Sequence, residues 1–427
     1  MSLKVTLKDS KELYRLMISQ LFYDGYQQVA LALANATNEQ ATCAPSNRLH
    51  AVVAAGLKIE KETQTEKNSL FEPILDGIDL DYQSESTPNA PAPAEYETVY
   101  VTSHKGPCRA AAFNQDGSLV ATGSVDNSIK ILDVEKMINR RDVGPVGDDM
   151  QSDAALHPVI RTLYDHSEEV TCLQFHPTEQ ILVSGSDDCT VKVYDFSKPS
   201  VKRAVKTIQE THPLRTLSIH PSGDYLLVGT LHPTIRLYDV NTCQCFVGSN
   251  PSDQHSMAVN MVTYSCNGSL YATCSEDGDI KIWDGVSSKV INMFPKAHDG
   301  NEIASVSFSR NGKYLLSSGK DALVKLWELS MSRCLIAYTG AGAGKSQFRS
   351  QACFNHTEDY VLFPDERNTT LCSWDSRNAE RKQLLSLGHN NPVRFIAHSP
   401  TNSSFITCSD DYRARFWHCK KNQDSIL

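Results

Sequence analysis

From residue 104 onward, short runs of alternating hydrophobic and polar residues recur at a nearly constant spacing. Each copy of the pattern contains an apolar run, a turn, a run of small and apolar residues, a second turn, and a closing run such as Ile280-Lys-Ile-Trp-Asp284. Alternation with a period of two predicts half-buried β-strands, and the Asp, Asn and Gly residues between the runs predict turns. The copies span residues 104–133, 166–195, 212–239, 255–284, 298–328, about 348–375 and 389–418.

The spacing of these copies predicts the architecture. The closing residues Asp239 and Asp284 are 45 positions apart, and most other neighbouring copies end 43 to 47 positions apart. A period of this length is typical of β-propeller blades with four strands each. The copies resemble the WD40 family, so we expect an all-β, seven-bladed WD40 β-propeller over residues 96–420. Residues 96–103 are strand-like and precede the first copy, and we expect them to pair with residues 414–418 and close the ring.

An acidic residue recurs seven positions before the end of five copies. These residues are Asp126, Asp188, Asp277, Asp321 and Asp411. Each falls in a predicted tight turn, where a carboxylate can accept hydrogen bonds from the backbone or from a histidine. The WD40 resemblance implies that each pairs with the histidine that opens its own blade. The third and sixth copies carry His232 and Asn368 instead, and we expect those blades to lack this link.

The same resemblance implies that residues beside each strand start and each turn aspartate face one rim of the propeller. Propellers bind partners through such loops on a rigid ring. The candidate partner-binding residues are Arg109, Glu169, Asp187, Arg215, Asn260, Lys320, Arg394 and Asp410. The alternative for each is a solvated surface position, since few interface residues carry most of the binding energy.

Residues 7–36 have a different periodicity, with apolar residues three or four positions apart on one helical stripe. Asp24-Gly25-Tyr26 interrupts the stripe and predicts two helices joined by a turn, and a third helix is expected over residues 46–60 with Ser46 as its cap. Helices this short bury little of their own stripe, so we expect residues 1–65 to form a small α-helical dimerisation domain. The stripe resembles the LisH dimerisation motif, and the alternative is a hairpin packed on its own propeller. The candidate dimer-interface residues are Leu13, Leu16, Met17, Leu21, Tyr26, Val29 and Leu33.

The remaining segments have the composition of connectors. Residues 66–95 are acidic and contain several prolines, which predicts a flexible linker. Residues 134–165 exceed the usual spacing between copies and are rich in charge, Gly and Pro, so we expect a mobile surface loop. Residues 421–427 form a tail after the last copy.

Composition limits the location and the partners. The 427-residue chain has 41 basic and 50 acidic residues and a net charge of −9, which argues against a broad nonspecific grip on nucleic acid. Its 13 cysteines show neither the spacing of a disulfide framework nor that of a zinc site, and we interpret them as reduced thiols. No apolar run is long enough for a membrane span, and residues 1–10 carry charges where a signal peptide would be apolar. We therefore expect a soluble intracellular protein with no membrane partner.

A glycine-rich run at residues 339–346 raises the question of nucleotide binding. It ends in Gly-Lys-Ser like a phosphate-binding loop, but Thr339 stands where the first glycine is required. The run also joins two predicted propeller strands, whereas phosphate binding needs a strand followed by a helix start. We expect a catalytically silent loop. We also expect no catalytic residue, metal or cofactor, because the repeated histidines lie in different blades and no nucleophile-base set stands out.

A closer resemblance extends from residue 7 to about residue 417. The segments that carry it are SQLFYDGY, CAPS, YVTSHKGPCR, HPVIRTLYDH, FHPTEQIL, CFNHTEDYVL, LSLGHNNPVR and CSDDYRARFW. They are similar to the WD-repeat subunits of cleavage stimulation factor (CstF), which serves messenger RNA 3′-end cleavage and polyadenylation. The resemblance implies a nuclear, non-enzymatic scaffold subunit, homodimeric through its N-terminal helices and bound through its propeller to the HAT-repeat subunit.

The resemblance also implies that RNA is contacted only indirectly, through a separate RRM subunit. The acidic chain agrees with this, since it lacks the aromatic signature of an RRM. Contacts with the RNA polymerase II C-terminal domain and with a ubiquitin-ligase partner are family expectations that no residue here demonstrates. Two rival interpretations are a WD40 substrate receptor of a ubiquitin ligase, for which the short helices lack an F-box-like pattern, and an NTPase that depends on Lys345.

Overall fold

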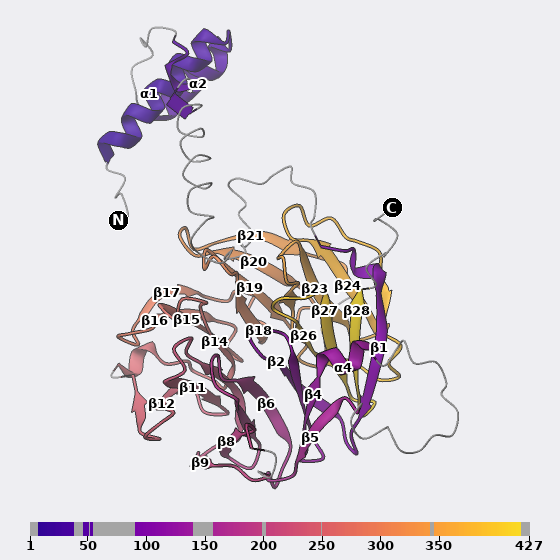
Figure 1. The fold of residues 1–427 in the computed structure, drawn as a ribbon. Coiled ribbons are helices and arrows are strands. Elements are labelled where there is room, and N and C mark those ends of the chain that lie inside the picture. The colour runs from indigo at the N-terminus through magenta and orange to yellow at the C-terminus, as the bar shows by residue number, and fades with distance from the viewer. Residues whose placement is uncertain are drawn as a thin grey trace. The chain divides into compact units, whose positions relative to one another are not determined.

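A computed structural model describes residues 7–37, 46–50, 52–53, 90–139, 157–198, 202–248, 250–341 and 346–419 (Figure 1). The chain divides into two compact units, residues 1–75 and residues 76–427.

The first unit contains a helical hairpin. Helix α1 spans Leu7–Tyr23 and helix α2 spans Gln27–Thr37, which confirms the two predicted helices. Gly25 in the turn has a φ of 86°, a left-handed conformation that glycine adopts without steric cost. The fully buried residues of the hairpin are Ile18, Ala30 and Ala34.

Only part of the third predicted helix falls within the described residues. Residues 48–50 and 52–53 are helical, and the Ser46 hydroxyl accepts a hydrogen bond from the Arg48 N–H at 3.2 Å. The other residues of the predicted 46–60 helix lie outside the described set, as do most of the predicted linker and the whole tail.

The second unit consists of seven four-stranded antiparallel sheets, which are the predicted propeller blades. Blade 1 contains β2 (Cys108–Phe113), β3 (Leu119–Ser124), β4 (Ile129–Asp133) and β5 (Val159–Leu163); blade 2 contains β6 (Val170–Phe175), β7 (Ile181–Ser186), β8 (Thr190–Asp195) and β9 (Lys206–Gln209); blade 3 contains β10 (Leu214–Ile219), β11 (Tyr225–Thr230), β12 (Arg236–Asp239) and β13 (Cys245–Val247). Blade 4 contains β14 (Val259–Tyr264), β15 (Leu270–Ser275), β16 (Ile280–Asp284) and β17 (Val290–Phe294); blade 5 contains β18 (Ile303–Phe308), β19 (Tyr314–Gly319), β20 (Val324–Glu328) and β21 (Arg333–Tyr338). Blade 6 contains β22 (Cys353–Phe354), β23 (Tyr360–Asp365), β24 (Thr370–Asp375) and β25 (Leu385–Ser386); blade 7 contains β26 (Val393–His398), β27 (Ser404–Ser409), β28 (Arg413–Cys419) and β1 (Tyr96–Ser103). Short helical segments are η1 (Pro93–Glu95), α4 (Val134–Asn139) and η3 (Pro251–Asp253).

The hydrophobic core lies between successive blades. The second strands β19 and β27 bury every residue, because neighbouring blades cover both of their faces. One interblade cluster joins Leu227 of blade 3 to Val262 and Trp283 of blade 4. The first strands of adjacent blades contact one another, so these strands surround the propeller axis.

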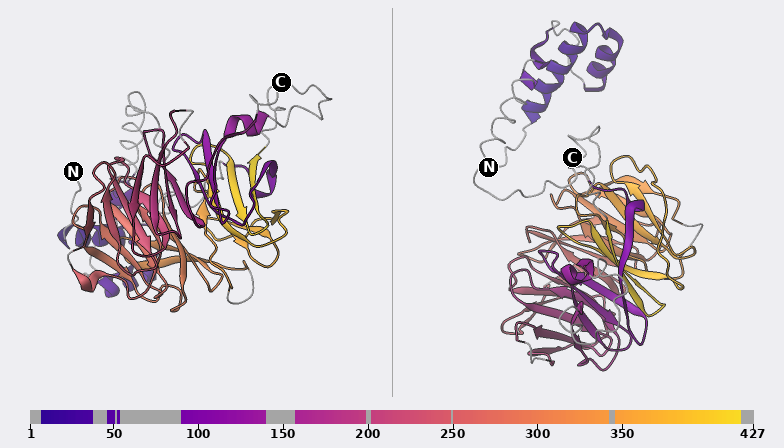
Figure 2. Two further views of the ribbon diagram at one scale, coloured as in Figure 1. Left: turned by 90° about the horizontal axis from the view of Figure 1, so that it is seen from below. Right: turned by 45° about the vertical axis from the view of Figure 1, so that its right-hand side comes forward.

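Blade 7 is assembled from both ends of the propeller sequence. Strand β1 pairs with β28 from Tyr96 opposite Cys419 to Ser103 opposite Arg413, and the two strands lie side by side in Figure 1. Tyr96 is buried and its ring lies 5.1 Å from that of Phe405, measured between centroids. The predicted closure is confirmed: β1 pairs with the outer edge of β28 and becomes the outer strand of blade 7. Figure 2 shows the blades in two further views.

The segment after blade 1's third strand differs from the predicted mobile loop. Residues 134–139 form helix α4, and residues 159–163 form the outer strand β5 of blade 1. Val134 and Met137 lie three positions apart on α4 and are buried in a cluster with Phe416, which explains why the helix is ordered. The prediction was therefore wrong at both ends of the segment, and residues 140–156 lie outside the described set.

Within the described residues, no helix has the length and apolar character needed to cross a membrane.

Candidate partner-binding site at the channel mouth

The innermost strand of six blades contains one residue that is out of register with the neighbouring strand. In blade 1 the pairing of β2 with β3 shifts between Cys108 and Ala110, and the same shift recurs in β6, β10, β14, β18 and β26. A β-bulge of this kind removes one residue from the ladder and re-aims its side chain. The bulge residues are Arg109, Thr171, Arg215, Asn260, Ala304 and Arg394, and all of them line one cavity.

This cavity has a volume of about 460 Å³ and lies on the propeller axis. Its lining comes from the inner strands of blades 1 to 5 and 7 and from residues 349–351, which precede blade 6. Because the lining includes residues that come just before the inner strands, the cavity opens at the end where those strands begin. We call this end the channel mouth.

The structure brings all eight predicted rim residues to the channel mouth. Six of them line the cavity: Arg109, Glu169, Asp187, Arg215, Asn260 and Arg394. Lys320 lies in an adjoining pocket beside Arg109 and Arg394. Asp410 pairs with Arg394 at 2.5 Å.

Sequence reasoning missed two carboxylates of the mouth, Glu276 and Glu302. In blades 1 to 5 and 7, the residue after the second strand donates its N–H to the carbonyl of the residue before the inner strand. This bond joins Asp187 to Glu169 at 3.0 Å, and it places Glu276 and Glu302 at the corresponding positions of blades 4 and 5. The register of the repeats could therefore have identified both residues.

Glu302 is the centre of an ion-pair network that connects blades 3 to 6. Its carboxylate accepts a hydrogen bond from Asn260 Nδ2 at 3.1 Å and pairs with Lys320 Nζ at 2.5 Å. Arg349 bonds to Glu302 and also pairs with Glu276 at 2.6 Å. Arg215 lies 3.8 Å from Glu276 and extends the network to blade 3.

A second set of contacts connects blade 7 to blade 1. Arg394 donates from Nε and Nη2 to one oxygen of Asp410, at 2.7 and 2.5 Å. Its guanidinium carbon lies 3.3 Å from the ring centroid of Phe348, a cation–π contact. Arg109 Nε lies 3.6 Å from the other Asp410 oxygen, and neither atom makes a hydrogen bond. Phe348 and Arg349 were not among the predicted rim residues, because the sixth repeat lacks the opening histidine from which the rim positions of the other repeats are counted.

The blade 2 side of the mouth is acidic. Burial and the neighbouring Glu169 raise the pKa of Asp187 to about 6, and Arg215 opposes this effect. The Asp187 carboxyl therefore holds a proton more readily than an isolated carboxyl does. The cations Arg109, Lys320, Arg349 and Arg394 of the mouth thus belong to blades 1, 5, 6 and 7, where Glu302 and Asp410 pair with them, whereas blade 2 contributes only carboxyls, Glu169 and Asp187.

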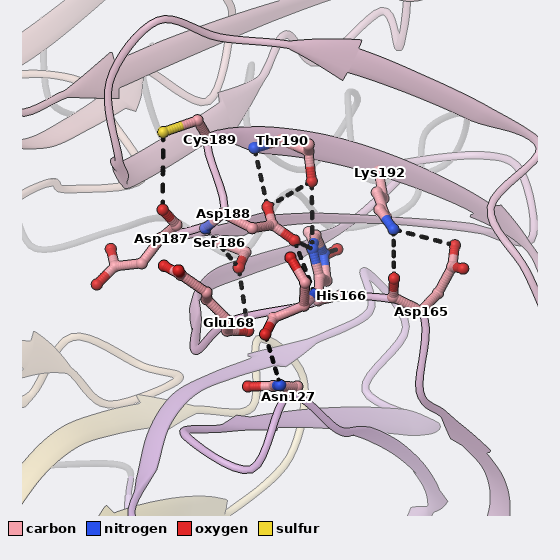
Figure 3. A network of polar contacts seen from close by, with 12 residues as sticks. Asn127, Asp165, His166, Glu168, Ser186, Asp187, Asp188, Cys189, Thr190 and Lys192 are labelled. Carbon is pink, nitrogen blue, oxygen red and sulfur yellow. Dashed lines mark hydrogen bonds and ion pairs between the residues drawn. The ribbon is translucent and has the colours of Figure 1, made fainter.

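The neighbouring turn aspartates point away from the mouth and into the blades. In blade 2, His166 Nδ1 and Asp188 are 2.8 Å apart, and Thr190 donates to the same carboxylate at 2.5 Å (Figure 3). The Asp187 side chain points the other way in the same view. Burial alone would raise the pKa of Asp188, but hydrogen bonds from Thr190 and His166 hold it below the usual value.

Three blades extend this link to a tryptophan. In blade 4, Trp283 Nε1–H donates to Thr273 Oγ1 at 2.9 Å, Thr273 and His255 Nε2 are 2.8 Å apart, and His255 Nδ1 and Asp277 are 3.0 Å apart. Because the ionised Asp277 carboxylate can only accept, the His255 proton lies on Nδ1, and in this neutral tautomer Nε2 accepts from the Thr273 hydroxyl while a hydroxyl lone pair accepts from Trp283. The same series occurs with Trp327 in blade 5 and Trp417 in blade 7.

Three blades depart from this arrangement. In blade 1, His104 Nδ1 contacts Ser128 at 2.9 Å and lies 3.6 Å from Asp126, so the implied direct pairing with the aspartate is replaced by a serine bridge. In blade 3, the His212 ring lies 5.1 Å from that of His232. In blade 6, Asn368 donates to Asp365. Blades 3 and 6 therefore have no aspartate at the usual position, as their sequences indicate.

The seven candidate dimer residues divide into two groups. Leu13, Met17, Tyr26 and Val29 are exposed large hydrophobic residues, with 39 to 62% of their surface accessible. Leu21 and Leu33 are half-buried and pack against the hairpin core, and Leu16 is also half-buried. The first group is available to a partner, whereas Leu21 and Leu33 stabilise the hairpin itself.

Comparison with known proteins covers both units. Residues 5–61 match the family described as "Cleavage stimulation factor subunit 1, dimerisation domain". The "WD domain, G-beta repeat" family matches residues 96–133, 158–195, 203–239, 249–284, 288–328 and 381–418. The chain is 39% identical over 420 residues to cleavage stimulation factor subunit 50 of Arabidopsis thaliana, covering 95% of each protein.

The chain belongs to the cleavage stimulation factor subunit 50 family. More distant similarity covers less of the chain. The identity is 27% with nuclear distribution protein nudF of Aspergillus niger over 60% of each chain, and 30% with pre-mRNA-processing factor 19 homolog 2 of Arabidopsis thaliana over 43% of this chain and 31% of that protein.

In this cleavage stimulation factor subunit 50 family member, the matched repeats leave blade 6 out. Blade 6 has the shortest inner strand, Cys353–Phe354, and no opening histidine. The structure therefore shows that blade 6 is present, and so that the propeller has seven blades, although the sequence of this repeat has diverged.

The glycine-rich run of this family member falls between two blades. Strand β21 ends at Tyr338 and β22 begins at Cys353, and residues 346–352 contain no helix. Lys345 itself lies outside the described residues. In the part of the chain that the structure describes, no three His, Cys, Asp or Glu side chains form a group that could hold a metal ion.

Proposed function

We propose that this chain is a non-enzymatic scaffold subunit of cleavage stimulation factor, acting in the nucleus in 3′-end cleavage and polyadenylation of pre-mRNA. The match to the Arabidopsis subunit over 95% of both chains carries the proposal. A rigid propeller that presents many charged side chains at one mouth suits protein binding.

The N-terminal hairpin is the homodimer contact in this proposal. The dimerisation-domain match and the exposed apolar residues Leu13, Met17 and Val29 support it, since exposed apolar groups gain free energy when a second copy covers them. Domain organisation follows the same division, with residues 1–65 as the dimerisation domain, 66–95 as the linker, 96–420 as the propeller and 421–427 as the tail.

Sedimentation of the full-length chain tests the dimer contact. We expect the wild type to be dimeric at micromolar concentration and a Leu13→Asp/Met17→Asp variant to be monomeric, because unpaired charges are costly in a buried contact. Both positions are exposed in the single chain, so helicity should persist. Gln28→Asp, at an exposed polar position of α2, is the matched control and should stay dimeric. A monomeric wild type, or a dimeric double variant, would remove the hairpin from the dimer contact.

The propeller binds the HAT-repeat subunit in this proposal, and the channel mouth forms part of that surface. Charge reversals Glu169→Lys and Arg215→Glu should each weaken co-precipitation of the HAT-repeat subunit by about tenfold or more, because truncated or reversed charges at an interface core cost about 2 kcal/mol or more. Arg333→Glu, at an exposed position on the outer strand of blade 5, is the control. Unchanged binding by both mouth variants would place the partner on another surface.

RNA is contacted through the separate RRM subunit in this proposal, and we expect no saturable binding of a GU-rich RNA by this chain alone. A contact with the RNA polymerase II C-terminal domain or with a ubiquitin-ligase partner stays an expectation of the family. The near-complete match to a cleavage stimulation factor subunit does not favour the alternative, a ubiquitin-ligase substrate receptor.

A further inference from the structure

A smaller pocket of about 250 Å³ adjoins the main cavity at the channel mouth. Its lining consists of Arg109, Lys320, Gln347, Phe348, Arg349 and Arg394. Four of these six residues are cations from different parts of the ring, and none is a carboxylate. We call it the cationic pocket.

The carboxylates that hold three of these cations are less exposed than the cations themselves. The side chains of Arg109, Lys320 and Arg349 are 29 to 31% exposed, against 15 to 25% for Glu302, Asp410 and Glu276, whereas Arg394 is 13% exposed and is as buried as Asp410. Glu366, which also lies near Arg394, accepts hydrogen bonds from the backbone N–H groups of residues 347 and 348. The ion pairs therefore fix the cations in place and leave their charged ends facing the pocket.

Asp410 holds two of the arginines in place. Arg109 Nε is buried 3.6 Å from the nearer Asp410 oxygen and makes no hydrogen bond, while the Arg109 side chain as a whole stays 31% exposed. The Arg394 guanidinium is held by one Asp410 oxygen on its edge and by the Phe348 ring on its face. This stacking orients its plane before any ligand arrives, which reduces the entropy lost on binding.

We propose that the cationic pocket binds a phosphorylated side chain of an extended peptide, whose flanking residues occupy the main cavity. The proposal deepens the proposed function, on which it rests, by naming the chemistry that the channel mouth recognises. A phosphate monoester carries about −1.5 to −2 charge at neutral pH and three acceptor oxygens, so it can engage several of the four cations at once. A carboxylate has one charge and two oxygens, so it would engage fewer of the four cations than a phosphate does.

The acidic side of the mouth argues against a nucleic acid as the occupant. Glu169 and Asp187 line the same cavity, and they would repel the successive phosphates of an RNA chain. A peptide meets this arrangement with a single phosphate in the cationic pocket and a lysine or arginine toward Glu169. The geometry thus favours a phosphopeptide that carries a basic residue.

Calorimetric titration of the full-length chain tests the assignment. The probes are inorganic phosphate and a six-residue alanine peptide that contains one phosphoserine and one lysine. We expect saturable binding of both, with the peptide tighter, and a weakening by about tenfold in Arg109→Ala and in Lys320→Ala, the usual cost of one charge-assisted contact. Arg109→Lys should keep part of the affinity, and Arg333→Ala, at the outer edge of blade 5, should keep all of it.

Each alternative outcome contradicts a different part of the inference. Equal binding of the unphosphorylated peptide, or of acetate, would show that phosphate is not recognised. Stronger binding of oligouridylate than of the peptide would assign the pocket to RNA, and unchanged affinity in both alanine variants would move the site elsewhere. Melting curves and sedimentation of the variants verify folding. If the channel-mouth variants lose the HAT-repeat subunit while phosphate fails to bind, the proposed function survives and this inference does not.

Discussion

The closure of the ring by β1 makes the stability of the whole propeller depend on eight residues that precede the first repeat. Tyr96 is the buried aromatic residue of this strand: it is 4% exposed and packs in one cluster with Phe405 and Trp417. Replacing a buried aromatic residue by alanine removes its burial and leaves a cavity, at a cost of about 3–5 kcal/mol. This loss is a large fraction of the roughly 5–15 kcal/mol that stabilises a typical domain.

Equilibrium urea unfolding of the full-length chain, followed by tryptophan fluorescence, measures the effect. We expect Tyr96→Ala to lower the free energy of unfolding by about 3–5 kcal/mol. Val101→Ala on the same strand is the matched control, since Val101 is 40% exposed and its truncation should cost less than about 1 kcal/mol.

Two truncations extend the test from one side chain to the strand. Removal of residues 1–85 leaves β1 intact and should preserve the melting temperature of the propeller, whereas removal of residues 1–103 deletes β1 and exposes the edge of β28. If the two truncations melt at the same temperature, or if Tyr96→Ala loses no more stability than Val101→Ala, then closure does not depend on β1 and the reasoning is wrong.

Three further predictions follow from the blades and from the glycine-rich run. Asp277→Ala leaves the Nδ1–H of His255 in blade 4 without an acceptor and should lower the free energy of unfolding by about 2–4 kcal/mol in the same assay. The control Asp284→Ala, where the exposed turn after β16 begins, should have little effect. Equal losses in the two variants would contradict a structural role for Asp277. Burial lowers the pKa of His104 to about 4, below its usual 6.5, so the stability that depends on neutral His104 is complete above about pH 6.5 and falls by roughly 3 kcal/mol as the pH falls toward 4. His104→Asn should flatten this pH dependence of the unfolding midpoint. An unchanged slope would show that His104 does not cause the dependence. Lys345→Ala should alter neither folding nor partner binding, and saturable ATP binding that depends on Lys345 would overturn the interpretation of residues 339–346 as a silent loop.

The local pattern of residues was sufficient to predict the strands, the blade repeat and the closing strand. Period-two alternation reports which face of a strand is buried, and Asp or Gly at fixed offsets reports the turns, so both signals survive in a single sequence. Local patterns cannot report contacts with distant segments, and for this reason the prediction of a mobile loop was wrong at residues 134–139. There, the burial of Val134 and Met137 in a cluster with Phe416 depends on a strand about 280 positions away.

The charged mouth could be predicted only in part. Repeat register placed Arg109, Arg215 and Arg394 on one rim, because each stands at the same position of its own blade. The position of Arg349 and Phe348 at the mouth was not predicted. The sixth repeat has no opening histidine and only a short inner strand, so the alignment of the repeats does not identify the equivalent positions.

What the sequence determined by itself was the number and spacing of the blades, the helical hairpin and the rim positions, because each depends on contacts within one repeat or one helix. Only the tertiary structure decided which charges meet. Ring closure places blade 7 beside blade 1, so Asp410 reaches both Arg394 and Arg109, although about 300 positions separate it from Arg109 in the chain. The distribution of cations and carboxyls around the channel mouth is a property of the closed ring, since electrostatic interaction depends on distance in space and not along the chain.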